Sequence, residues 1–538
     1  DFVPPQPGKT DAVSRAQWLL FLYLRSYEWL KLPDRTGRYF QSKGGAGTWV
    51  CPNPEDTWGS SDYVFTVRSA GVRNLFPEWF GCAGLLAEGA YSGVPYLREQ
   101  ADRSGSRLSV ILETGAGGHA QPYWDWRVAY TGTYALCAAS RADDLDNDFM
   151  DESTYETQSN PENASQFMRF RDGVSKAKAF QQARAEVPQR PKTDVLCVSE
   201  RPPARASGSV FYGVGNPYSL AGGLSRAHIL FDHRDRFELE RVLDRYRVIA
   251  YSAFAPRAGE LARLRQWLAA KPGRVLVTHT FIPTRDAREY WGMDRTSALG
   301  KAEGGALLGL GRIEASDVKT CRITGAAPGW DKLFPVGEEL KLPSALTRCS
   351  QGEALVSTDA GPLVTRARVG SGEVLYLHFS AEKPMAPPVL SLNARVMQAL
   401  TATGRLTVQC QADREALTQI FDVPGGRSVA IWDGPTLDKW EFRYVPGLPM
   451  LQYAAPGVDR TVRLPVGTAG KYLTYDFWAD HLDEAAPTEG TLTLRLKDTV
   501  CALYYAGPDT PKLRATIASA QKARAWLRDL KFDTEVKP

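Results

Sequence analysis

Residues 107–118 read RLSVILETGAGG, and this stretch decides how the first third of the chain is interpreted. Residues suited to a buried strand are followed by a carboxylate, Glu113, and then by a run of small residues. A short apolar run that ends at glycines predicts a buried strand. Glu113 is therefore either a surface loop residue that accepts hydrogen bonds from backbone N–H groups, or a carboxylate held at the mouth of a pocket.

Strand and helix patterns alternate around this stretch. The predicted strands are 47–54, 70–80 and 126–140, and the predicted helices are 11–31, which ends at Leu32-Pro33, 90–103 and 163–184. This alternation predicts a parallel sheet with its ligand site at the carboxyl ends of the strands. Glu78 and Glu113 both fall at such ends. Four strands with three or four helices amount to half of a (β/α)₈ barrel.

The pattern changes twice further along the chain. The next strands are predicted over 194–198, 247–253, 273–278 and 369–379, with a helix over 258–270. They indicate an open, doubly wound α/β domain. Beyond residue 411 the apolar period becomes two, which is typical of an antiparallel β-sandwich, and a helix over 511–531 closes the chain. The expected fold is therefore α/β: a partial barrel over 1–190, the doubly wound domain over 191–410, and a sandwich with a terminal helix over 411–538.

The charge of the chain is balanced, with 65 basic and 61 acidic residues in 538 and a net charge of +4. This balance does not indicate a nucleic-acid partner or an anionic membrane surface. The apolar stretch 16–24 is far shorter than the roughly 20 residues of a membrane-spanning helix, so no membrane span is expected. No signal peptide opens the sequence, and the compartment stays open, with a secreted or periplasmic location favoured over a cytoplasmic one.

The number and spacing of the cysteines and histidines indicate whether the protein needs a metal or a redox cofactor. Eight cysteines are scattered without a CxxC pair, which argues against a zinc site or a redox dithiol. One disulfide, between Cys321 and Cys349, is compatible with the sequence but is not established by it. Six histidines in 538 residues argue against a metalloenzyme. We therefore expect neither a metal nor an organic cofactor.

Three stretches carry a resemblance to a known family: VILETGAGG at 110–118, QFMRFRDGVSKAKAF at 166–180, and YRVIAYSAFAPRAGELARLRQWLAAKPGRVLVT at 246–278. With the order of the predicted pieces, they resemble the multidomain clan A glycoside hydrolases, and in layout the family 42 β-galactosidases. The first stretch is similar to the seventh barrel strand, which delivers the nucleophile. The second is similar to the helix after the last barrel strand. The third is similar to the amidotransferase-like trimerisation domain, so the resemblance implies a homo-oligomer.

The chain departs from this family in two places. In such enzymes the acid/base glutamate ends strand four, immediately before the helix that begins here near residue 12. We therefore expect the first barrel half, with the acid/base group, to come from a separate chain or from a segment missing from this sequence. In working amidotransferases a cysteine follows the central strand, whereas Ser252 and Ala253 stand there in this chain without a cysteine or a nearby histidine. The middle domain is therefore predicted to be non-catalytic.

Retaining glycoside cleavage needs two carboxyl groups about 5–5.5 Å apart, one of them a nucleophile that reaches the anomeric carbon. The resemblance makes Glu113 this nucleophile, and its small neighbours would let a sugar ring approach. Glu78 is predicted to bind a hydroxyl or to orient Glu113. Further predicted substrate-binding residues are Trp79, His119, Tyr123, Trp124, Trp126 and Arg127. Each aromatic is also compatible with ordinary packing, and His119 with a solvated loop.

The acidic segment from Asp143 to Glu152 has the carboxylate density of a calcium loop, but Phe149 stands where an EF-hand requires glycine. We expect a solvated acidic loop, with the option of binding sugar hydroxyls. The predicted function is hydrolysis of glycosidic bonds in an oligo- or polysaccharide. The alternative is a non-catalytic carbohydrate-binding or structural assembly protein with a degenerate glycosidase fold. A third option, an amidase that uses the middle domain, lacks its cysteine.

Overall fold

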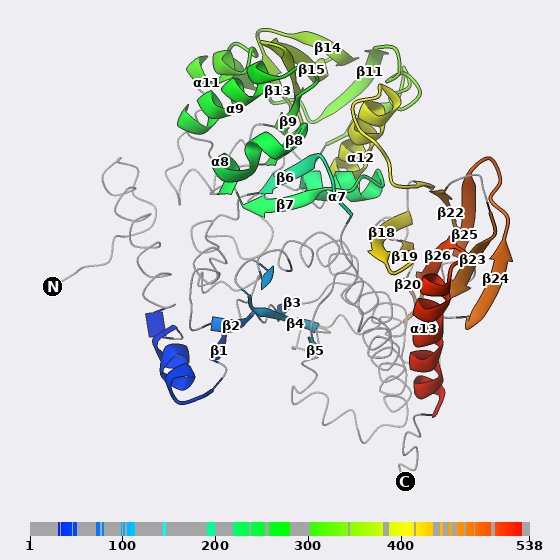
Figure 1. The fold of residues 1–538 in the computed structure, drawn as a ribbon. Helices are drawn as coiled ribbons and strands as arrows, with labels where there is room; N and C mark the ends of the chain where they lie inside the picture. The colour runs from blue at the N-terminus through cyan, green and yellow to red at the C-terminus, as the bar shows by residue number, and fades with distance from the viewer. Residues whose placement is uncertain are drawn as a thin grey trace. The chain divides into compact units, whose positions relative to one another are not determined.

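The computed structural model forms two compact units (Figure 1). The first contains residues 1–78, 99–107 and 193–408, and the second contains 79–98, 108–192 and 409–538. The structure describes residues 31–32, 34–45, 47–50, 72–75, 78–79, 98, 101–102, 105–112, 144–146, 191–199, 219–235, 238–252, 258–279, 302–342, 345–379, 387–413, 416–433, 442–444, 451–453, 460–466, 470–477, 479–496 and 501–529. The division into three domains at residues 190 and 410 stays a prediction.

A large mixed sheet organises the first unit. Its parallel part contains, in sheet order, β7 (Asp232–Asp235), β6 (Val195–Ser199), β8 (Val248–Ser252), β9 (Val275–His279) and β16 (Gly372–Leu377). Numbered along the chain, this is the strand order 2-1-3-4-5 of a doubly wound sheet. An antiparallel extension continues from β16 through β15 (Gly361–Val369), β14 (Glu353–Thr358), β11 (Thr320–Ala326) and β12 (Glu339–Lys341).

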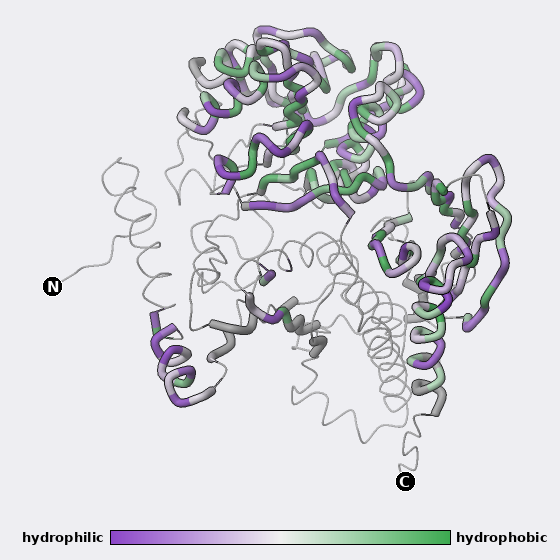
Figure 2. Tube along the Cα trace, viewed as in Figure 1, coloured by the Kyte–Doolittle hydropathy of each residue, from purple (hydrophilic) through white to green (hydrophobic). Residues whose placement is uncertain are grey.

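Helices cover both faces of the parallel strands because successive side chains of a strand point to opposite faces. Val248 and Ala250 of β8 pack in one buried cluster, with α7 (Ser219–Arg226) and α12 (Pro387–Ala402). Ile249 and Tyr251 pack in another, with α8 (Leu239–Val242), α9 (Ala258–Ala270) and α11 (Ala302–Leu307). Figure 2 shows the charged edge strand β7 as hydrophilic. No helix among the described residues is long and apolar enough to cross a membrane.

Local patterns located these parallel elements well. The strands predicted over 194–198, 247–253, 273–278 and 369–379 correspond to β6, β8, β9 and β16, and the helix predicted over 258–270 is α9. The antiparallel extension was not predicted. Nor was a small sheet of β10 (Ile313–Ala315) and β13 (Thr347–Cys349). Strands β11 and β12 alternate exposed and buried residues and have one buried face.

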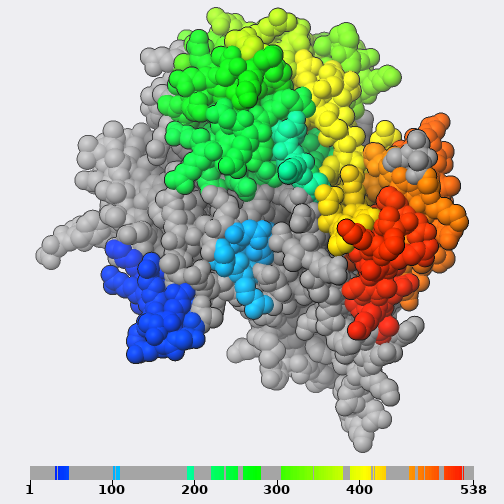
Figure 3. Space-filling model, viewed as in Figure 1, coloured from blue at the N-terminus to red at the C-terminus, as the bar shows by residue number. Residues whose placement is uncertain are grey.

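The second unit contains an antiparallel sheet in the order β18 (Ala416–Val423), β19 (Gly426–Asp433), β26 (Cys501–Pro508), β23 (Tyr472–Asp476) and β24 (His481–Ala485). A smaller sheet of β17 (Gln411–Ala412), β22 (Arg460–Pro465) and β25 (Thr491–Leu496) packs on one face through a shared apolar cluster. Helix α13 (Pro511–Asp529) packs on the other face through Leu513, Ile517 and Ala520. Its outer side lies on the surface, in red in Figure 3. A separate hairpin pairs β20 (Phe442–Tyr444) with β21 (Leu451–Tyr453).

The N-terminal third contains short parallel pairs. In the first unit, β1 (Thr48–Val50) pairs with β2 (Val72–Leu75). In the second unit, β4 (Arg107–Leu112) pairs with β5 (Asp144–Asp146). Within the strand predicted over 70–80, the structure describes β2 and a second short strand, β3 (Glu78–Trp79). The predicted strand 126–140 and helix 163–184 lie outside the described residues.

Two predictions for this third of the chain were wrong. Residues 34–42 are helical, so the helical pattern does not stop at Leu32-Pro33. An ion pair between Arg38 and Asp34, four residues apart, stabilises this helical segment. The acidic segment from Asp143 to Glu152 is not wholly a loop, because residues 144–146 form β5. Parallel pairing with β4 outweighs the poor strand propensity of aspartate there.

Candidate functional site

The backbone around Glu113 is an element that could present a catalytic carboxylate. Ser109, Val110 and Ile111 of β4 pair in parallel register with residues 144–146 of β5. Glu113 directly follows Leu112, the last residue of β4. The carboxyl ends of parallel strands meet at one edge of a sheet, where active sites of barrel enzymes are built. Glu113 therefore follows the carboxyl end of a hydrogen-bonded parallel strand, which is the end at which barrel enzymes place catalytic groups.

The other predicted site residues fall partly or wholly outside the described residues. Glu78 and Trp79 form the backbone of β3. The side chains of these two residues lie outside the described part of the chain, as do all atoms of Glu113, His119, Tyr123, Trp124, Trp126 and Arg127. Their roles in catalysis and sugar binding stay predictions.

The doubly wound sheet places Ser252 at a position where ligands bind in such folds. Ser252 ends β8 and pairs in register with Ser199, the last residue of β6. The strand order reverses between these two strands, and ligand sites in open α/β sheets lie outside the carboxyl ends at that point. Residues 200–218 and 253–257, which follow these two strands in the sequence, lie outside the described residues.

A cysteine and a histidine do meet in the first unit, away from Ser252. The thiol of Cys349, the last residue of β13, lies 3.7 Å from Nε2 of His378, which directly follows β16. Nδ1 of His378 lies 2.8 Å from the carbonyl oxygen of Thr347, so Nδ1 carries the proton and donates it there. Nε2 is then an acceptor, and the hydroxyl of Thr365 donates to it at 2.7 Å. Twenty-nine residues separate the pair in sequence, so no local motif revealed it.

The electrostatics of this pair do not favour a nucleophile. His378 is fully buried, and burial lowers its pKa to about 4, against a smaller opposing effect of the hydrogen bond to Thr347. Burial also raises the pKa of the Cys349 thiol. A cysteine nucleophile is activated by a cationic neighbour or a lowered pKa, and neither is present in this pair. The arrangement instead satisfies polar groups inside the sheet.

Cys349 was also part of the suggested disulfide with Cys321, and that suggestion was wrong. Among the described residues, neither Cys321 nor Cys349 forms a disulfide. Cys321 lies in the large sheet and interacts with Thr358, whereas Cys349 lies in the small sheet and faces His378. The same described residues contain no group of three or more His, Cys, Asp or Glu side chains placed to hold a metal ion.

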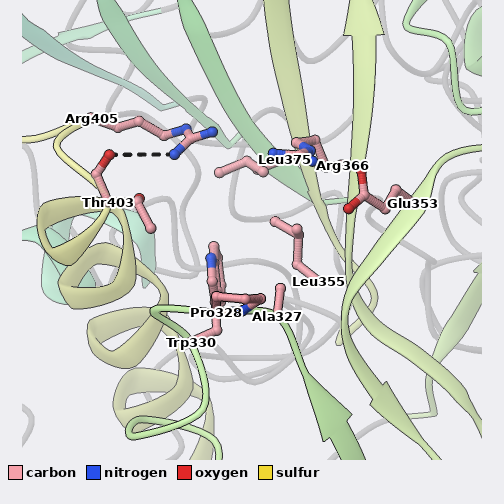
Figure 4. Close-up of a pocket in the computed structure, with 9 residues that line it drawn as sticks. All are labelled: Ala327, Pro328, Trp330, Glu353, Leu355, Arg366, Leu375, Thr403 and Arg405. Carbon is pink, nitrogen blue, oxygen red and sulfur yellow. Dashed lines mark hydrogen bonds and ion pairs between the residues drawn. The ribbon is translucent and has the colours of Figure 1, made fainter.

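A cavity of about 180 Å³ opens in the antiparallel part of the large sheet (Figure 4). Its side chains come from β14, β15 and β16, from the loop after β11 and from the segment after α12. The lining residues are Ala327, Pro328, Trp330, Glu353, Leu355, Arg366, Leu375, Thr403 and Arg405. Trp330, Leu355 and Leu375 are at most 5% exposed and form an apolar lining. Figure 4 shows the guanidinium groups of Arg366 and Arg405 at the same end of the cavity, away from Trp330 and Pro328.

Both arginines that line the cavity form ion pairs with glutamates. Arg366 Nη2 donates to Glu353 at 2.6 Å, and the Glu353 side chain is 60% exposed. Arg405 binds Glu373 through Nε and Nη2. The hydrogen bonds that Arg405 donates to Glu373 raise the pKa of Arg405. Nε of Arg366 is buried and has no hydrogen-bond partner in the described part of the chain. The cavity thus combines an apolar wall, a spare N–H donor and a partly exposed carboxylate.

Solved structures with a similar fold are β-galactosidases. A catalytic mutant of Gan42B, a GH42 beta-galactosidase from G. stearothermophilus, is 11% identical with a TM-score of 0.51 and covers 82% of this chain and 60% of its own. A beta-galactosidase from Bacillus circulans sp. alkalophilus is 13% identical with a TM-score of 0.52, over 82% and 61%. A beta-galactosidase from a Rahnella species is 13% identical with a TM-score of 0.50, over 83% and 61%. No protein-family model and no curated protein sequence matches this chain.

These similarities concern the fold. The chain has a mixed α/β architecture with a layout like that of the GH42 beta-galactosidases, so the resemblance in layout inferred from the sequence is confirmed. The chain spans about three fifths of the length of those enzymes.

Proposed function

We propose that this protein hydrolyses glycosidic bonds, with Glu113 as the nucleophile of a retaining mechanism. The position of Glu113 carries the proposal: it directly follows β4, a strand paired in parallel with β5. Barrel enzymes present catalytic groups at such strand ends. The layout shared with β-galactosidases supports a sugar substrate.

In this mechanism the Glu113 carboxylate attacks the anomeric carbon and forms a glycosyl ester, while a second carboxylic acid protonates the leaving oxygen. That acid, now a carboxylate, then takes a proton from water. The water oxygen bonds to the anomeric carbon and Glu113 is released. Thr114, Gly115 and Ala116 follow Glu113 in the sequence and add little bulk beside the reacting carbon.

The acid/base group is assigned to a carboxyl group outside residues 1–538. In the family that the sequence resembles, this group ends the fourth barrel strand. A separate chain or a neighbouring segment would supply that strand. We further propose that Glu78 binds a substrate hydroxyl, that Trp79, Tyr123, Trp124 and Trp126 offer stacking faces, and that Arg127 and His119 bind sugar oxygens.

Active-site labelling tests the proposal. The protein, purified with any chain that accompanies it, is treated with a 2-deoxy-2-fluoro glycoside, and its peptides are analysed by mass spectrometry. We expect a glycosyl adduct on Glu113. Glu113→Gln should lower the rate of hydrolysis by about a thousandfold or more, since the covalent step is lost. Azide should restore turnover of Glu113→Gly and give a glycosyl azide of inverted configuration, because azide would attack from the vacated face.

Glu314→Gln is the control, because Glu314 is an exposed carboxylate whose only described partner is Arg312 on the same surface. Its rate should equal that of the unmodified protein. A label on another residue, or full activity of Glu113→Gln, would reject Glu113 as the nucleophile. Sugar binding without turnover or label would favour the non-catalytic alternative.

A further inference from the structure

We propose that the cavity around Trp330 and Arg366 binds a single neutral pyranose ring and serves as a non-catalytic sugar site. Its lining comes entirely from residues 327–405, within the first unit. The site therefore shares no residue with the proposed hydrolytic machinery around Glu113, and the inference goes beyond the proposed function.

The polar groups of the cavity suit hydroxyl groups. The buried Arg366 Nε–H lacks an acceptor among the residues that the structure describes, and a buried donor without a partner is costly. A sugar hydroxyl can accept from it and can donate in turn to Glu353, whose carboxylate is paired with the neighbouring Nη2 and is otherwise open to solvent. Hydroxyls both donate and accept, so one ring with adjacent hydroxyls can bind both groups.

The charge balance excludes an anion as the preferred ligand. The positive charge of Arg366 is matched by Glu353, and that of Arg405 is matched by Glu373, which binds it through two hydrogen bonds. An added carboxylate or phosphate would find no uncompensated cation and would lie close to Glu353. A neutral ligand avoids this repulsion.

The size and the apolar wall indicate one ring. A volume of about 180 Å³ is roughly ten times the space that a single water needs. Trp330, Leu355 and Leu375 line the cavity with buried aromatic and aliphatic side chains, and such an apolar lining is compatible with the C–H groups of a pyranose. Pro328 and Glu353 are exposed and mark the opening.

The test uses the full-length protein labelled with ¹⁵N in its tryptophan indoles. Trp330→Phe assigns the Trp330 indole signal. Methyl β-galactoside, methyl β-glucoside and methyl β-mannoside are titrated separately, with glucuronate and inorganic phosphate as anionic probes. We expect at least one neutral glycoside to shift the Trp330 signal in a saturable way. Arg366→Lys keeps the charge beside Glu353 but removes the Nε–H donor, so it should weaken that binding by roughly tenfold or more.

Arg322→Lys is the matched control, because Arg322 is exposed on β11 and does not line the cavity. It should leave the affinity unchanged, and so should Glu113→Gln. The inference is overturned if no neutral glycoside shifts the Trp330 signal, if only glucuronate or phosphate does, or if Arg366→Lys binds as tightly as the unmodified protein. None of these outcomes would affect the labelling result at Glu113.

Discussion

The thiol of Cys349 is close enough to His378 to exchange a proton, but its surroundings oppose ionisation. Because burial raises the pKa of Cys349 and keeps His378 neutral, the thiolate should form only above the pH at which a free cysteine ionises. We expect iodoacetamide to modify Cys349 severalfold more slowly than it modifies the thiol of free glutathione at pH 7. The rate of modification of Cys349 should rise steadily up to pH 9. Peptide-resolved mass spectrometry separates Cys349 from the other cysteines.

Thr365→Val serves as the companion variant, since it removes the hydroxyl that occupies Nε2 of His378. The steady rise of the rate with pH should persist in this variant. A rate that reaches a plateau below pH 7 would instead indicate a thiolate–imidazolium pair. That result would revive the amidase option for the middle of the chain.

Helices α7 and α12 pack closely at a glycine, Gly223 of α7. A Cβ at Gly223 of α7 would lie 2.6 Å from Cβ of Asn393 on α12 and 3.0 Å from its carbonyl carbon. Both neighbours are rigid, so the helices would have to separate. We expect Gly223→Ala to lower the free energy of unfolding by about 1–3 kcal/mol, as overpacking does, despite its better helix propensity. Urea denaturation followed by circular dichroism measures the change.

Gly259 of α9 is the matched glycine, because a Cβ there would meet no atom within 4 Å. Gly259→Ala should leave stability unchanged or raise it by up to about 1 kcal/mol. If the two substitutions changed the free energy of unfolding equally, the close contact between α7 and α12 at Gly223 would be wrong.

Elements differ in how far the sequence reveals them. Helix α9 and strands β6, β8 and β9 follow from local patterns, because each carries a continuous buried run or a clear helical period. Strand β5 was missed because its partner β4 stabilises it across more than thirty residues, against the local preference of its aspartates. Such tertiary pairing leaves no trace in a short window of sequence.

At the scale of the whole molecule, the layout was recoverable from the order of the elements, while the sites within it were not. The Cys349–His378 pair and the cavity around Arg366 join residues from several strands and loops. In the sequence these residues look like ordinary charged or polar positions of half-buried strands. The register of β14, β15 and β16 brings the cavity residues of these strands together, and the hydrogen bonds between Thr347 and His378 bring Cys349 to His378.

Two buried histidines of the first unit make its stability depend on pH. Burial lowers the pKa of His279 to about 4, as it does for His378. An unfolded chain protonates both near 6.5, so between pH 6.5 and 4 the unfolded state binds more protons and stability falls as the pH falls. Each histidine should contribute about 3 kcal/mol to this loss. Hydrogen exchange of the β9 and β16 amides against pH measures it.

The variant that separates this effect from general acid denaturation is His279→Asn, which removes one titrating group from the core. Its stability should fall less steeply over the same pH range than that of the unmodified protein, by the share that His279 contributes, whatever its stability at pH 7. His481→Asn is the control: His481 is 65% exposed on the edge strand β24, where it pairs with Asp483. That variant should keep the full slope. If His279→Asn also kept it, carboxylates rather than buried imidazoles would govern the acid limit of this fold.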